Sequence, residues 1–232
     1  MSAPLSVQIS SNILSTKSIL PSQAWLTTFL STQKPNLPLQ SLCQTALYRL
    51  LASEISTSVQ PTPENTFPPN IHDISVPQSL IKGPVVAQIV DVEDIGHSKY
   101  SQLEALESAE RGEKTKGKEV IRVIPGEADD TDPDNLGLSG VGGPHRLLLE
   151  DAKGTRVYGM EFKAIKDVSI GMNIGSKVVL KDVKALRGVL LLEPGNTTLV
   201  GGKVEELHKQ WREDRKGKLK AAIEAAKAEE DG

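Results

Sequence analysis

Histidine is the commonest metal ligand and a frequent catalytic base, and the four histidines in this chain are scattered along the sequence. His97, His145 and His208 have no partner at the spacing of a metal site. His72 is followed by Asp73, but this pair lies in a proline-rich stretch with nothing nearby for it to activate. The histidines therefore indicate neither a metal centre nor a catalytic base.

A glycine-rich segment from Gly137 to Gly143 is only superficially similar to a nucleophile elbow or a phosphate-binding loop. Both motifs require a strand before the loop and a helix after it, and neither context is present here. The single cysteine, Cys43, excludes an internal disulfide framework, cannot build a zinc site alone and fits a reducing compartment. We therefore expect a protein that is not an enzyme and that uses no cofactor, metal or small-molecule substrate.

Direct binding of nucleic acid is the next class of function to consider. The net charge is −3, whereas strong non-specific DNA binding needs a concentrated positive surface. Aromatic residues make up only 3% of the chain, and the strand-like segments carry only Tyr158 and Phe162. These two positions share one face of a strand, but two aromatics do not make a base-stacking platform. We therefore expect weak direct DNA binding and a mainly protein-binding module.

Several short runs of aliphatic and β-branched residues are typical of strands. They are 85–92, 147–150, 155–162, 177–183 and 188–192, with 198–200 as a short tail. Lys153 and Gly154 form a tight turn between the second and third runs, which predicts an antiparallel hairpin. Five short antiparallel strands predict a small closed barrel such as the OB-fold.

Helices should precede this barrel. Apolar residues recur at helical spacing in Leu5–Leu14, in Pro21–Leu30 and in Leu39–Ile55. Ser22 can cap the second of these helices. Amphipathic helices of this length must pack on one another and on the barrel to bury their apolar stripes. Trp25 is then a core residue in preference to a base-stacking platform.

A long insertion interrupts the barrel between its first and second strands, at about residues 93–145. Loops of this length in compact domains are usually functional or disordered. The first part, Ser98–Arg111, is compatible with a helix. Tyr100 and Leu103 would share one face of that helix.

An apolar island, Glu119–Pro125, lies between charged flanks in the middle of the insertion, and an acidic run, Glu127–Asp132, follows it. Such an island can become buried on a partner, so it is a candidate docking segment. The sequence alone leaves two alternatives open, namely an edge strand folded on the chain's own barrel and simple disorder.

The last segment, Lys203–Glu230, is helical by composition, and Leu207 and Trp211 could pack it onto the barrel. It also carries a group of cations: Lys209, Arg212, Arg215, Lys216, Lys218 and Lys220. This basic group could contact phosphates or an acidic partner, although a solvated helix face is the commoner meaning of such a pattern. Lys216 and Lys218 are the possible DNA contacts.

Three segments, in the same order, carry a family resemblance. They are YSQL at 100–103, GMEFKAI at 159–165, and LRGVLLLEP at 186–194 followed by LVGGKV at 199–204. They resemble motifs of the RecQ-mediated genome instability protein 1 family, and the last is similar to the end of its OB domain. With a weaker N-terminal helical match, the resemblance covers most of the chain outside the insertion and the tail. It indicates a fungal-type member of that family, with a single OB domain.

This family is the non-catalytic subunit of the topoisomerase III–RecQ helicase complex. The resemblance implies a nuclear scaffold that binds topoisomerase III, and with it a RecQ helicase. It implies no association with a membrane. It also implies that the insertion modulates the open gate of the topoisomerase, promoting decatenation and the dissolution of double Holliday junctions in recombination and repair. The partner-binding residues would be Tyr100, Leu103, Val120, Ile121, Val123 and Ile124 in the insertion, and Lys177 and Arg187 on the barrel surface.

Two other functions remain as alternatives. One is a single-stranded-DNA-binding OB module that recruits the helicase to DNA. The other is a purely structural stabiliser of the topoisomerase. They differ in whether the isolated protein binds an oligonucleotide and in whether the insertion matters.

The predicted fold class is α+β, with an N-terminal helical bundle packed on a five-stranded OB-fold β-barrel. The regions are 1–60 (helical), 61–83 (a proline-rich strap), 84–202 (OB-fold with the insertion) and 203–232 (C-terminal helix). No apolar run reaches the roughly 18–20 residues that span a bilayer. The N-terminus also lacks a secretory signal, so we expect a soluble intracellular protein.

Overall fold

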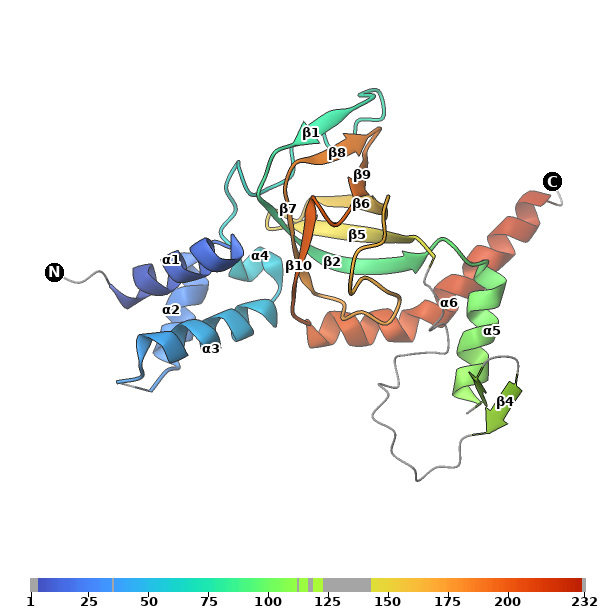
Figure 1. Ribbon diagram of the computed structural model, residues 1–232, viewed down its shortest axis with the longest axis horizontal. Coiled ribbons are helices and arrows are strands. Elements are labelled where there is room, and N and C mark those ends of the chain that lie inside the picture. Colours follow the sequence, from blue (N-terminus) through green and yellow to red (C-terminus); the bar gives the residue numbers. More distant parts are fainter. Residues whose placement is uncertain (1–3, 35, 112, 117–118, 123–142, 231–232) are drawn as a thin grey trace.

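The computed structural model describes residues 4–34, 36–111, 113–116, 119–122 and 143–230, with backbone alone in the two four-residue stretches. Helices come first, a curled sheet follows, and a long final helix extends from the sheet past the helix at residues 99–110 (Figure 1). This order is the predicted one.

The N-terminal region is a small helical bundle. Its helices are α1 (Leu5–Lys17), α2 (Gln23–Ser31), α3 (Leu39–Leu51) and the short α4 (Ile55–Ser58). Ser22 caps α2 as predicted, because its hydroxyl accepts a hydrogen bond from the backbone N–H of Trp25 at 3.2 Å. The Trp25 ring is half-buried and stacks on Phe29 with ring centroids 5.5 Å apart. Trp25 therefore packs within the bundle.

Eight strands form the main sheet, in the order β1-β8-β9-β6-β5-β2-β7-β10. All neighbours are antiparallel except β6 and β9, which are parallel. The strands are β1 (Ser79–Ile81), β2 (Val85–Asp94), β5 (His145–Asp151), β6 (Arg156–Glu161), β7 (Lys177–Leu180), β8 (Val183–Leu186), β9 (Val189–Leu192) and β10 (Thr197–Gly201).

The segment 177–183, predicted as one strand, is divided in the structure. Only Lys181 and Asp182 separate β7, which pairs with β2, from β8, which pairs with β9. Asp182 has a φ of 55°, a left-handed conformation that interrupts an extended strand. Because this short segment supplies strands near both ends of the sheet, the sheet curls into a half-barrel whose order stays open between β1 and β10. The predicted OB-fold is confirmed, with an open sheet of eight strands in place of a closed barrel of five.

Two apolar cores hold these parts together. The first fills the curled sheet and includes Ile89, Leu149 and Leu190. The second joins the helical bundle to the back of the sheet and includes Leu50 and Val86. The first five residues of β2 are all buried, because the sheet core covers one face and the helices cover the other.

The insertion contains a helix, α5 (Lys99–Glu110), and a hairpin of β3 (Glu113–Lys116) and β4 (Glu119–Arg122). β4 is the described part of the apolar island, and it pairs with β3 in a separate two-stranded sheet. Thus this part of the island is not an edge strand of the OB sheet, which removes one of the alternatives left open by the sequence.

The C-terminal segment is one continuous helix, α6 (Glu205–Glu230), as predicted. It continues through Gly217, where an added Cβ would meet open space. Val204, Trp211 and Leu219 are buried, so the first part of the helix packs against the rest of the protein. In the part of the chain that the structure describes, no helix combines the length and the apolar character needed to cross a membrane.

Candidate protein-binding site

The insertion leaves the sheet through a narrow neck that holds its two ends side by side. The pairing of β2 with β5 runs out to Asp94 opposite His145. Beyond that pair, a Cβ atom built on Gly96 would lie 2.6 Å from the Cα of Gly143. Such a contact is too close for any side chain, so glycine at this position lets the two chain segments meet.

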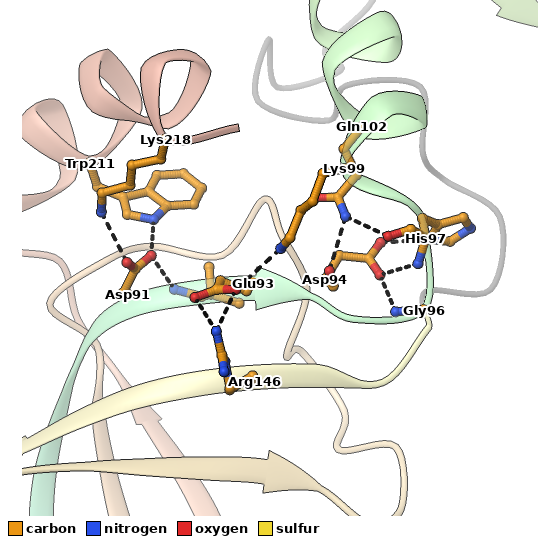
Figure 2. A network of polar contacts seen from close by, with 11 residues as sticks. Asp91, Glu93, Asp94, Gly96, His97, Lys99, Gln102, Arg146, Trp211 and Lys218 are labelled. Carbon is orange, nitrogen blue, oxygen red and sulfur yellow. Dashed lines mark hydrogen bonds and ion pairs between the residues drawn. The ribbon is translucent and has the colours of Figure 1, made fainter. Parts of the chain in front are cut away.

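Asp94 stabilises the β2 side of the neck, as Figure 2 shows. One carboxylate oxygen accepts hydrogen bonds from the backbone N–H groups of Gly96 (2.7 Å) and His97 (3.0 Å). The other lies 2.7 Å from Nδ1 of His97. Burial favours a higher pKa for Asp94, but the hydrogen bonds from His97 and Gly96 outweigh it, so the pKa lies below its usual value. Asp94 is therefore an ionised, buried anchor.

Glu161 stabilises the other side of the neck. One of its oxygens lies 2.6 Å from Nδ1 of His145 and accepts the His145 backbone N–H at 2.9 Å. The other accepts the backbone N–H of Ile165 at 2.9 Å. Burial opposes ionisation of Glu161, but the hydrogen bond from His145 and the backbone donors lower its pKa overall. His97 and His145, two of the three histidines that have no partner at metal-site spacing in the sequence, thus have carboxylate partners, and both pairs are structural.

Ion pairs hold the first helix of the insertion against the C-terminal helix. Lys216 of α6 places its Nζ 2.5 Å from Glu110 and 3.6 Å from Glu107, both on α5. Lys220, one turn further along α6, also lies 3.6 Å from Glu107. We call this set of contacts the α5–α6 brace. It fixes the direction in which α5 extends from the neck.

The same two helices are tied to β2. Asp91 of β2 accepts hydrogen bonds from the indole N–H of Trp211 (2.6 Å) and from Lys218 (3.0 Å), both on α6 (Figure 2). Gln102 of α5 is 2% exposed and donates to the backbone carbonyl of Asp94 at 3.0 Å. The neck, α5 and α6 are therefore joined through β2.

The structure places the predicted contact residues of the insertion in three different settings. Tyr100 is 67% exposed on α5, and Leu103 is half-buried on the same helix. Val120 and Ile121 lie in β4 opposite β3. Val123 and Ile124 lie outside the described residues. A role for these six residues in partner binding stays a prediction.

The prediction of a surface position for Lys177 is wrong. Its side chain is fully buried, and its amine donates to the backbone carbonyls of Leu51 (3.2 Å), Ser53 (2.5 Å) and Gly175 (2.9 Å). It thus joins the end of α3 to the OB sheet. Burial lowers the pKa of Lys177 to about 7, and attraction to Glu54 opposes this shift.

The other predicted cations are already engaged within the chain. Arg187 is exposed, and it donates to the backbone carbonyl of Ile74 at 3.3 Å. Lys216 and Lys218, expected as possible DNA contacts, pair with carboxylates of α5 and β2. Any phosphate that bound them would compete with these ion pairs, so their positions favour a structural role.

The sheet also presents an apolar surface that sequence analysis recognised only through Tyr158 and Phe162. Cross-strand pairing aligns Leu148, Tyr158, Val189 and Leu186 in one row, and Arg146, Met160, Leu191, Lys184 and Leu80 in the next. We call these rows, with Phe162 beyond the end of β6, the outer apolar face. Phe162 is 63% exposed, Leu80 51% and Tyr158 43%. The signal that could have revealed the face is the alternation along β6, whose exposed positions include Tyr158 and Met160.

Two cations at the outer apolar face are paired with carboxylates, whereas Lys184 of the second row is exposed. Arg146 lies over the Tyr158 ring at 4.8 Å and pairs with Glu93 at 2.9 Å. Lys163 pairs with Glu193 at 2.8 Å. The exposed side chains of this face are mainly apolar, so it favours an apolar protein surface over a polyanion.

A helical bundle joined to an OB-fold with an anchored insertion defines a binding or scaffolding module of the OB class. Within the described residues, no group of three or more His, Cys, Asp or Glu side chains could hold a metal ion. Two family models match the chain: "RMI1, N-terminal helical domain" over residues 13–58 and "RMI1, N-terminal OB-fold domain" over residues 63–215.

Similar proteins carry a common name. RecQ-mediated genome instability protein 1 of Schizosaccharomyces pombe is 36% identical over 180 residues, which cover 72% of this chain and 74% of that protein. The proteins of that name in chicken and mouse are 28% and 26% identical, over 61% and 59% of this chain but only 21% of their own length. The chain belongs to the RecQ-mediated genome instability protein 1 family.

Proposed function

We propose that this protein is a non-catalytic scaffold that binds topoisomerase III, and with it a RecQ helicase, in the nucleus. Its family supports a role in genome stability through the RecQ pathway. In this proposal the outer apolar face docks the topoisomerase and the insertion reaches its open gate. The result is more complete decatenation and more dissolution of double Holliday junctions.

The observation that carries this proposal is the anchoring of the insertion. A segment that acts on a gate must be held in a defined direction relative to the rest of the protein. The neck and the α5–α6 brace hold the insertion in this way. A segment that binds the open gate better than the closed gate shifts the equilibrium by its differential affinity, and by no more. Slower religation and more complete strand passage would follow.

Binding to topoisomerase III tests the first part of the proposal. We expect Tyr158→Glu to weaken the complex by about tenfold or more, because it places a charge in a buried apolar contact. The matched control is Tyr48→Glu, since Tyr48 is an exposed tyrosine of α3, far from the outer apolar face along the chain. Affinity is measured by calorimetry with purified topoisomerase III. Equal affinity in both variants would contradict docking through this face.

The second candidate function is single-stranded DNA binding. The exposed rings of Tyr158 and Phe162, with Arg146 over Tyr158, favour it, because stacked bases use such groups. Fluorescence anisotropy of a labelled oligothymidylate with the isolated protein distinguishes the two. We expect no binding below the micromolar range. Tight, salt-sensitive binding that Tyr158→Ala weakens would instead support the DNA-binding function.

A further inference from the structure

A cavity of about 360 Å³ lies between β2, α5 and α6. Four cations line it, Lys99, Arg146, Arg215 and Lys218, against two carboxylates, Asp91 and Glu93. Apolar side chains, among them Ile170, Trp211 and Leu219, also line it. The cavity is therefore cationic and apolar at once. It adjoins the neck of the insertion and shares only Arg146 with the rows of the outer apolar face.

Each of the two arginines that line this cavity has one buried guanidinium nitrogen without a hydrogen-bond partner, namely Nε of Arg146 and Nη2 of Arg215. Most buried polar atoms in proteins are hydrogen-bonded, so two unpartnered donors at one cavity point to a missing acceptor. Three of the four lining cations already pair with a carboxylate: Lys99 with Glu93 (3.2 Å), Lys218 with Asp91 (3.0 Å), and Nη2 of Arg146 with Glu93 (2.9 Å).

Arg215 is the stronger indication. Its residue is 8% exposed, and the guanidinium lies over the Trp211 ring at 5.4 Å. Among the described residues no ion pair joins it to a carboxylate, although Asp94 attracts it from a greater distance. A buried guanidinium without a carboxylate partner is costly, and an incoming anion would remove that cost.

We propose that this cavity binds an acidic and apolar peptide segment of a partner protein. A carboxylate of the peptide accepts hydrogen bonds from Arg146 and Arg215, and an apolar side chain of the peptide packs on Trp211 and Leu219. Carboxylate and guanidinium form strong charge-assisted hydrogen bonds of this kind. The inference goes beyond the proposed function, since it requires neither topoisomerase III nor residues 112–142.

Charge distribution favours a peptide over a nucleic acid. Asp91 and Glu93 line the cavity, and α5, one of the helices that bound it, also carries Glu107 and Glu110. A phosphate backbone would bring successive charges past these carboxylates and be repelled. A peptide brings one carboxylate to the two arginines, together with the apolar side chain that the cavity needs.

The test uses the full chain and a fluorescein-labelled peptide of alternating Asp and Leu, followed by anisotropy. We expect binding that is lost when Asn replaces each Asp. Arg215→Met should weaken binding about tenfold, because a charge-assisted hydrogen bond is removed. Lys209→Met is the matched control, because it removes a cation from the exposed side of the same helix. It should bind as the unaltered protein does.

A second variant keeps the test decisive if Arg215→Met does not fold. Ala222 lines the cavity and is exposed on α6, so Ala222→Trp should fill the cavity without removing a charge. It should also weaken binding about tenfold. Equal binding by the Asn peptide, or unchanged binding by Ala222→Trp, would overturn the proposal. Displacement of the peptide by oligothymidylate would also overturn it, since the cavity would then be a phosphate site.

Discussion

Single residues decide how the helical bundle and the OB sheet are joined. Lys177 crosses this junction, and its amine meets three backbone carbonyls, two of them at the end of α3. Carbonyls at a helix C-terminus lack partners within the helix and attract cations. The cost is the removal of an ammonium group from water. The effect of burial is larger than the attraction to Glu54, so the pKa of Lys177 falls from 10.5 to about 7.

This shift predicts a pH dependence of stability. Between about pH 7 and pH 10.5 the unfolded chain binds more protons at Lys177 than the folded chain does. The free energy of unfolding should therefore rise with pH in that window, by at most about 1.4 kcal/mol per pH unit. Urea unfolding at about pH 7.5, near the lower end of this window, and at about pH 9, near its middle, measures the pH dependence of the free energy of unfolding. The slope should be smaller in Lys177→Met, and equal slopes would contradict a depressed pKa.

At the scale of elements, the α5–α6 brace is the arrangement with most consequence for function. α5 belongs to the insertion and α6 to the C-terminal segment, and only their side chains join them. Exposed ion pairs are individually weak and screened by salt. The direction of α5 should therefore be adjustable by substitution without unfolding the OB sheet.

A charge exchange tests the brace. Lys216→Glu places a negative charge beside Glu107 and Glu110, so the amides of α5 should exchange hydrogen about two to five times faster. Adding Glu110→Lys to the same chain should restore slow exchange. Lys209→Glu, which disturbs only a pair within α6, serves as the control. Unchanged exchange in Lys216→Glu would show that the ion pairs do not hold α5.

Much of the fold could be predicted from the sequence because local signals and the final structure agree. Helical spacing located α1 to α3, the Ser22 cap marked the start of α2, and the Lys153–Gly154 turn marked the hairpin of β5 and β6. α6 was predicted despite Gly217, which sits at an exposed position where no packing is lost.

The residues of the candidate site were harder to predict, because their partners are far away in sequence. Lys177 is the first residue of a strand, and its sequence neighbours give no sign that its amine meets carbonyls at the end of α3, more than 120 residues earlier. Lys216 belongs to a basic group that suggests a DNA contact, but in the structure it pairs with Glu107 and Glu110, which lie more than 100 residues earlier in the chain. Pairing over such distances depends on tertiary packing, which local patterns do not encode.

The whole molecule combines a platform, held together by shared packing, with an insertion anchored at both ends. The platform is the helical bundle and the curled sheet, joined by a continuous apolar core and by Lys177. In the proposed function this platform docks topoisomerase III while the insertion acts on the open gate. These two roles are separable, so one variant can remove the second and leave the first.

Decatenation by topoisomerase III with a variant protein tests this claim most directly. Residues 112–142 are replaced by a short Gly-Ser linker that keeps the neck, including Gly96 and Gly143, and keeps α5. We predict that the variant still co-purifies with topoisomerase III but loses most of its stimulation of decatenation. Full stimulation by this variant would contradict the account and leave the protein as a structural stabiliser of the topoisomerase.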